Sequence, residues 1–169
     1  VYVDRNGDGE ITDADKYLYH SKDPAVTINW QNTFNWKNWD LGFALRSSIG
    51  NWVYNANEKN NCFISSTNTA PLSNLLDDTY LWKITRDTRE ITSDYFVRNA
   101  SFLRCDNITL GYTWPSLING NLRLRLYGAV QNPFVITKYK GLDPEVGSGI
   151  DNNVYPRPIT FTLGVVAQF

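Results

Sequence analysis

The sequence predicts an all-β chain whose antiparallel strands cross a membrane as one part of a larger barrel. Five segments alternate apolar with polar or small side chains at the period of two that a strand requires. Their lengths approach the roughly 9 to 11 residues that a tilted strand needs to cross a bilayer. The connections between them are alternately short and long, as in outer-membrane barrels. Because natural barrels of this kind have at least about 8 strands, these five are expected to form only part of a wall.

The first two segments predict a tight hairpin. Residues 26–36 and 39–46 each place apolar side chains on one face, and only Lys37 and Asn38 lie between the two runs. Two such runs joined by two polar residues are typical of a β-hairpin. The apolar face of this hairpin carries Ile28, Trp30, Phe34, Trp36, Trp39, Leu41, Phe43 and Leu45.

The next two segments, residues 106–114 and 121–131, are separated by a short turn at 115–120. Leucine, isoleucine, valine and aromatic residues again share one face of each segment. Arg123 and Arg125 share the opposite face, and two arginines would be costly in a dry protein core. We therefore expect the apolar faces to contact lipid and the polar faces to line a water-filled lumen.

The last segment, residues 158–169, ends the chain on an aromatic residue, Phe169. A strand with one apolar face and an aromatic carboxy-terminus looks like the closing strand of an outer-membrane barrel. If this strand ends on the periplasmic side, every short turn lies there and the long connections, 50–101 and 132–157, are extracellular. The predicted organisation is an extracellular loop over residues 1–24, followed by barrel strands and loops over residues 25–169.

The amino-terminal loop contains the most specific short motif. Oxygen-bearing side chains alternate around a glycine, Gly9, as in the twelve-position calcium loops of EF-hand and dockerin type. An aspartate stands at the last position, where the EF-hand has glutamate. The alternative is an ordinary turn of Asp, Asn and Gly residues. The expected ligands of a structural Ca²⁺ ion are Asp4, Asn6, Asp8, Glu10, Thr12 and Asp15.

The composition argues against several other functions. The chain has a net charge of -1 and no basic run, so nucleic acid is not an expected partner. It has one histidine, His20, and no nucleophile or phosphate-binding motif, so we expect no enzyme. Two cysteines, Cys62 and Cys105, leave open whether they are bridged or separate. No segment of signal-peptide type is present, so we expect the chain to be part of a longer exported polypeptide.

An ordered set of motifs along the chain resembles the carboxy-terminal part of the SusC/RagA-type TonB-dependent transporters of Bacteroidetes outer membranes. The motifs are Asp4-x-Asn-Gly-Asp-Gly-Glu-Ile11, Thr33-Phe-x-Trp-Lys-x-Trp-Asp-Leu41, Asn99-Ala-Ser-Phe-Leu-Arg104, Asn107-Ile-Thr-Leu-Gly-Tyr112, Gln131-Asn-Pro-Phe134, Thr137-Lys-Tyr-Lys-Gly-Leu-Asp-Pro144 and Tyr155-Pro-Arg-Pro158.

The resemblance implies a barrel of about 22 strands with a plugged lumen. It also implies TonB-driven import of oligosaccharides or peptides, and a SusD-like surface lipoprotein that caps the barrel. The remainder of the barrel and plug, the TonB complex and outer-membrane lipid are the other implied partners. In this interpretation the present chain contributes the closing wall and its extracellular loops.

The sequence leaves two questions open. Aromatic residues of the long loop could stack on sugar rings or serve ordinary loop packing; they are Trp52, Tyr54, Tyr80 and Trp82. The alternative to a transporter is a soluble, calcium-stabilised β-sandwich that binds carbohydrate. That alternative requires residues such as Phe161 and Leu163 to be buried against a second sheet.

Overall fold

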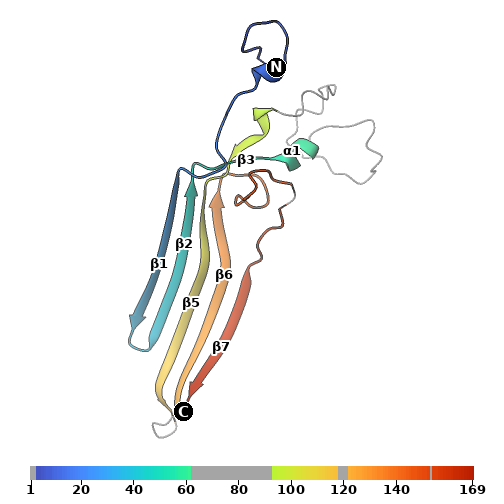
Figure 1. Cartoon of the computed structure of the whole chain (residues 1–169). Helices are drawn as coiled ribbons and strands as arrows, with labels where there is room; N and C mark the ends of the chain where they lie inside the picture. The colour runs from blue at the N-terminus through green and yellow to red at the C-terminus, as the bar shows by residue number, and fades with distance from the viewer. Residues whose placement is uncertain (1–2, 62–92, 118–121, 153) are drawn as a thin grey trace, which may run out of the picture.

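A computed structural model describes residues 3–61, 93–117, 122–152 and 154–169. Its main body is one antiparallel sheet with the strand order β1-β2-β5-β6-β7 (Figure 1). This arrangement confirms the predicted all-β, antiparallel class. The strands are β1 (Val26–Trp36), β2 (Trp39–Ile49), β5 (Phe102–Leu117), β6 (Leu122–Thr137) and β7 (Thr160–Gln168).

Small elements gather at one end of this sheet. β3 (Trp52–Tyr54) and β4 (Val97–Asn99) form a two-stranded ribbon, and α1 (Ala56–Asn61) follows β3. Two 3₁₀ turns cover Asp13–Asp15 and Asp94–Phe96. The amino-terminal loop and the β6–β7 connection lie at this same end, whereas the β1–β2 turn and the carboxy-terminus lie at the other (Figure 1). The predicted separation of long and short connections is therefore observed.

Strand boundaries differ from the prediction at a bulge. β5 begins before the predicted start at residue 106, and β6 continues past the predicted end at residue 131. Asp106 is left out of the pairing with both neighbouring strands, and Asn132 and Pro133 lie opposite it. A bulge shifts the phase of the alternation, so the period-two pattern breaks there. Asn132 adopts a φ of 50°, which asparagine tolerates, and a bulge accommodates proline, which lacks an N–H.

Other strand ends also differ from the prediction, and β7 covers Thr160–Gln168 in place of residues 158–169. β2 extends beyond residue 46 to Ile49. β5 continues through Pro115 to Leu117, which pairs with Leu122 after an irregular step in the register, so residues 115–117 belong to the strand and not to the turn. With the extensions at the bulge and at Leu117, β5 and β6 have 16 residues each.

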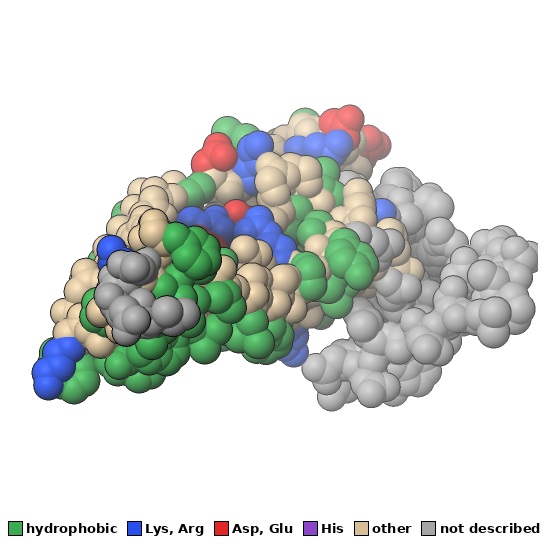
Figure 2. Space-filling view, turned by 90° about the horizontal axis from the view of Figure 1, so that it is seen from below, with side chains coloured by type: hydrophobic (Ala, Val, Ile, Leu, Met, Phe, Trp, Pro, Cys, Tyr) green, Lys and Arg blue, Asp and Glu red, His purple; other side chains and the backbone are tan. Residues whose placement is uncertain are grey.

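The register separates the side chains into an apolar and a polar face. Directly paired residues of antiparallel strands share a face, and seen end-on (Figure 2) hydrophobic side chains cover one side of the sheet while charged side chains gather on the other. The apolar face includes Ile28, Trp30, Phe34, Leu41, Phe43, Leu110, Leu126, Phe161, Leu163 and Val165; the polar face includes Thr27, Asn29, Gln31, Thr33, Asp40, Arg46, Asn107, Thr109, Arg123, Arg125, Thr160 and Thr162.

The apolar face is not covered by a second layer of the described chain. Leu163 is 87% exposed and Phe161 is 78% exposed, and the only other sheet among the described residues is the short β3–β4 ribbon. A β-sandwich would bury both residues, so that alternative is wrong for the described residues. The small buried core lies instead at the ribbon end and contains Val53, Ala100 and Tyr139 with Val146 against it. None of the described helices has the length and hydropathy to cross a membrane.

Candidate functional site

The polar face of the sheet carries a charge pair that crosses a whole strand. Arg125 on β6 donates from Nε to Asp40 Oδ1 (3.0 Å) and from Nη2 to Asp40 Oδ2 (2.5 Å), and Asp40 belongs to β2. The pair passes over β5 at Gly111, where a Cβ atom would collide with both side chains. A bidentate arginine–carboxylate pair has fixed geometry, so this contact joins β2 to β6 through side chains, across β5, in addition to the backbone pairing.

A second glycine makes room beside that pair. Tyr127 lies directly opposite Gly164 on β7, and a Cβ atom at position 164 would overlap the tyrosine ring. The Arg125 guanidinium stands 4.9 Å from the centre of the same ring, within range of a cation–π interaction. Asp40, Arg125 and Tyr127 thus form one row across the polar face.

Nearer the long loops, the bulge brings an acid to an arginine. In an unbroken strand Asp106 and Asn107 would point to opposite faces, yet Asp106 accepts hydrogen bonds from Arg46 Nε (3.1 Å) and Nη2 (3.2 Å). Arg46 also donates to both carboxylate oxygens of Glu145, at 2.6 and 3.1 Å. The bulge therefore lets Arg46 bind a carboxylate of the wall and a carboxylate of the β6–β7 loop at once.

Two further arginines join this cluster. Arg104 Nη2 lies 2.6 Å from Asp143 Oδ1, and both side chains are almost fully buried, at 4% and 5% exposure. Arg157 Nη2 lies 2.9 Å from Glu145 Oε2. We call the six residues the loop latch: Arg46, Arg104, Arg157, Asp106, Asp143 and Glu145. The loop latch fixes the β6–β7 loop to the polar face of the sheet.

The same loop is anchored again near its middle. The Tyr139 hydroxyl donates to Asp151 Oδ2 at 2.6 Å, and both residues are buried. Burial and this carboxylate raise the pKa of Tyr139 above its ordinary value. Burial would also raise the pKa of Glu145, but the hydrogen bonds and positive charges of the arginines outweigh burial and lower that pKa below 4.5.

The amino-terminal loop is closed by its own acidic side chains. Asp4 accepts from the backbone N–H groups of Gly7 (2.6 Å) and Gly9 (2.8 Å), whose φ angles are 77° and 84°. Asp15 Oδ1 accepts from Arg5 N and Oδ2 from Thr12 N, each at 2.8 Å. These backbone donors, Thr12 first, lower the pKa of Asp15. The alternating acids thus turn inward around the two glycines.

This geometry does not by itself define a metal site. Among the described residues, no three His, Cys, Asp or Glu side chains stand close enough together to hold an ion. Asn6 donates to Asp8 Oδ2 at 2.7 Å, and Asp8 Oδ1 accepts from Glu10 N. The predicted ligands share one small loop, but side-chain oxygens of Asp4, Asp8 and Asp15 accept hydrogen bonds from the chain itself, so calcium binding stays a prediction.

The loop aromatics are engaged in contacts with each other. The Trp52 ring is stacked on His20 with centroids 3.6 Å apart and planes 7° apart, and Tyr54 meets Phe96 edge-on at 6.2 Å. One face of Trp52 is therefore occupied, so the structure favours packing over a sugar platform there. Tyr80 and Trp82 lie outside the described residues, as does Cys62. The Cys105 thiol is free and buried beside the bulge.

The loop latch was not predicted from the sequence. Arg46 and Glu145 are 99 positions apart, and Arg104 and Asp143 are 39 apart, so no periodicity relates them. The sequence contains one indication of the Arg125–Asp40 pair. Both residues stand on predicted polar faces, and Gly111 leaves a gap on the polar face of the strand between them.

The architecture defines the class of protein: a segment of barrel wall with one apolar face, one charged face and ordered loops at one end. Structural comparison agrees. The RagAB peptide transporter matches with a TM-score of 0.69 at 20% identity over 94% of this chain and 19% of that chain. The RagAB peptide importer in its closed-closed state matches with a TM-score of 0.64 at 21% identity, over 95% and 20% of the two chains.

Sequence comparison is more specific. The chain is 43% identical over 176 residues to the TonB-dependent receptor SusC of Bacteroides thetaiotaomicron, covering all of this chain and 17% of the receptor. It is 29% identical over 188 residues to the TonB-dependent receptor P3 of Formosa agariphila, covering all of the chain and 19% of the receptor. No family model matches the sequence. The chain belongs to the SusC/RagA type of TonB-dependent receptors.

The chain spans less than a fifth of the length of these two receptors. The relatives are receptors and transporters and not enzymes, in agreement with the sequence-based expectation. SusC/RagA-type receptors are outer-membrane β-barrel proteins. In such a wall the apolar face would contact lipid and the polar face would line the lumen, so the two faces are called the lipid face and the lumen face below.

Proposed function

We propose that this chain forms part of the wall of an outer-membrane transporter that imports oligosaccharides or peptides by a TonB-dependent mechanism. One observation carries the proposal: a five-stranded wall with a lipid face and a charged lumen face is built on a sequence 43% identical to SusC. In this proposal the wall belongs to a barrel of about 22 strands with a plug inside. The loop latch would hold one extracellular loop over the lumen.

The proposed partners follow from the same likeness. A SusD-like surface lipoprotein would contact the extracellular loops, and the TonB complex would act on a part of the transporter outside this chain. The fold match to a peptide importer and the sequence match to SusC support this kind of assembly. The ordered loop end, with its buried Tyr139–Asp151 contact, offers such a lipoprotein a preformed surface.

Uptake by cells tests the proposal. Cells that lack the full-length gene are compared with complemented cells for uptake of fluorescent oligosaccharides and of a labelled peptide mixture, with and without a functional TonB. We expect one of the two substrate classes to be taken up only when both the receptor and TonB are present. Uptake that is unchanged by loss of the receptor for both classes would contradict the proposal, and co-purification in detergent would identify the lipoprotein.

We further propose that the amino-terminal loop binds one structural Ca²⁺ ion through oxygens of Asp4, Asn6, Asp8, Glu10, Thr12 and Asp15. The alternation of these oxygens around Gly9 supports the proposal. Calcium is expected to protect the loop from trypsin cleavage at Arg5 and Lys16, and a chelator to remove the protection. Asp8→Asn should abolish the protection, whereas Asp13→Asn, at an exposed acid outside the ligand set, should keep it. Equal cleavage with and without calcium would refute the site.

A further inference from the structure

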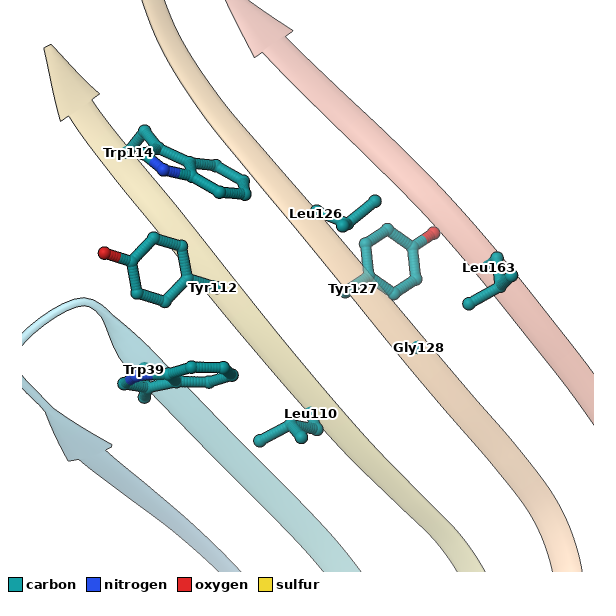
Figure 3. A pocket seen from close by; sticks show the side chains of 8 residues that line it. All are labelled: Trp39, Leu110, Tyr112, Trp114, Leu126, Tyr127, Gly128 and Leu163. Atoms are coloured by element: carbon teal, nitrogen blue, oxygen red, sulfur yellow. The ribbon is translucent and has the colours of Figure 1, made fainter. Parts of the chain in front are cut away.

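The lipid face has a groove at its short-turn end. Its volume is about 620 Å³, and Figure 3 labels the residues that line it: Trp39, Leu110, Tyr112, Trp114, Leu126, Tyr127, Gly128 and Leu163. By its register the Tyr127 side chain belongs to the opposite, polar face. The register explains the hollow. Leu110, Gly128 and Leu163 are paired in one row across β5, β6 and β7, and the missing side chain of Gly128 leaves a notch between the two leucines.

The groove has a polar end and an apolar end. Trp39, Tyr112 and Trp114 stand edge to face in a row, with ring centroids 4.8 and 4.6 Å apart. The Tyr112 hydroxyl accepts a hydrogen bond from Asn38 in the β1–β2 turn, so this row marks the level of the turn. The leucine notch lies one row further into the sheet. Aromatic rings with a polar atom favour the headgroup level of a bilayer, and aliphatic side chains favour its core.

We propose that this groove is a binding site for one phospholipid of the leaflet on the short-turn side. One acyl chain lies in the notch over Gly128, and the headgroup lies at the level of Trp39, Tyr112 and Trp114. The polarity of the groove along the strands matches an amphiphile of this orientation. The inference rests on the proposed membrane location of the wall.

The test fills the notch without disturbing the sheet. A Cβ atom at position 128 would meet only Leu163 Cδ2, at an ordinary contact distance of 3.5 Å, so Gly128→Ala fits without a close contact and Gly128→Leu is the larger of the two fillings. The matched control is Ala167→Leu, which adds the same bulk on the lipid face of β7 outside the groove. Each full-length variant is purified from membranes in mild detergent, and native mass spectrometry with added phosphatidylethanolamine measures phospholipid retained per barrel.

We expect wild type and Ala167→Leu to retain one phospholipid, Gly128→Ala to retain less, and Gly128→Leu to lose retention about tenfold, the effect of excluding roughly two methylene groups. Equal retention by wild type and Gly128→Leu overturns the site. Equal loss in the control overturns it too, because the lipid is then adventitious. A change from dimer to monomer in Gly128→Leu without loss of lipid assigns the face to a second copy instead. Failure of the proposed function is read separately, as solute uptake that does not depend on the receptor.

Discussion

At the scale of single residues, Gly111 decides whether the charge pair of the lumen face can form. Arg125 and Asp40 stand on strands that are not neighbours, and they meet only because the strand between them has no side chain at this point. The atoms that a methyl group would meet are the ends of two flexible side chains. A substitution should therefore displace the ion pair and leave the backbone in place.

We predict that Gly111→Ala lowers the free energy of unfolding by about 1 kcal/mol, the upper range for a partly exposed ion pair. The matched control is Gly42→Ala on the same face of β2, where the new Cβ has no neighbour closer than 3.8 Å and should cost nothing. Thermal unfolding of the full-length barrel, followed by circular dichroism, gives the comparison. If Gly111→Ala costs as much in an Arg125→Gln background as in wild type, the ion pair is not the cause.

At the scale of elements, the loop latch is the contact that orders the β6–β7 loop. Asp143→Asn removes the carboxylate charge paired with Arg104, whose side chain is 4% exposed and whose Nε lies 3.7 Å from Glu145 Oε2 without a hydrogen bond. Removing one partner of a buried pair costs about 3 to 5 kcal/mol. We predict faster trypsin cleavage at Lys138 and Lys140 in this variant. Leu142→Ala, at the exposed neighbouring position, should leave cleavage unchanged; equal acceleration in both variants would exclude the ionic explanation.

The latch also predicts a pH dependence. The pKa of Glu145 in the folded loop is below its ordinary value of 4.5, so its contribution to stability is complete above pH 4.5. That contribution is lost as the pH falls through the lower, folded-state pKa. The hydrogen-exchange protection factors of residues 138–152, taken relative to the unfolded chain at each pH, should therefore stay high from pH 7 to about pH 4.5. They should fall only below that pH. Glu145→Gln should exchange faster already at pH 7, and a wild-type loop that loosens between pH 7 and 5 would contradict this assignment.

The strands were predictable because each one is long enough to repeat its alternation, as β1 shows from Val26 to Trp36. Their ends were not, because Asp106 and the Asn132–Pro133 pair mimic loop residues while forming a bulge inside the sheet. β3 and β4 have three residues each, too few to display a period. The calcium motif was visible because its spacing is local, whereas the loop latch joins residues whose proximity only the fold creates.

At the scale of the whole molecule, the two faces of the sheet differ in what they should tolerate. Thr162 and Leu163 are neighbours on β7, but the register places Thr162 opposite Ala129 on the lumen face and Leu163 opposite Gly128 on the lipid face. A charge on the lipid face must enter the hydrocarbon layer, and a charge on the lumen face stays in water. The orientation of the entire wall is therefore testable at two adjacent positions.

We predict that Leu163→Arg lowers the free energy of unfolding of the inserted barrel by roughly 1 to 2 kcal/mol, between the cost of arginine at the interface and at the bilayer midplane. Thr162→Arg should cost less than about 1 kcal/mol, because Arg123 and Arg125 already share that face. Unfolding by denaturant in lipid vesicles measures both. Leu163→Lys serves as a second charged probe, since its ammonium must enter the same layer. If Thr162→Arg is the more damaging change, the faces are reversed and the sheet is not oriented as a transporter wall.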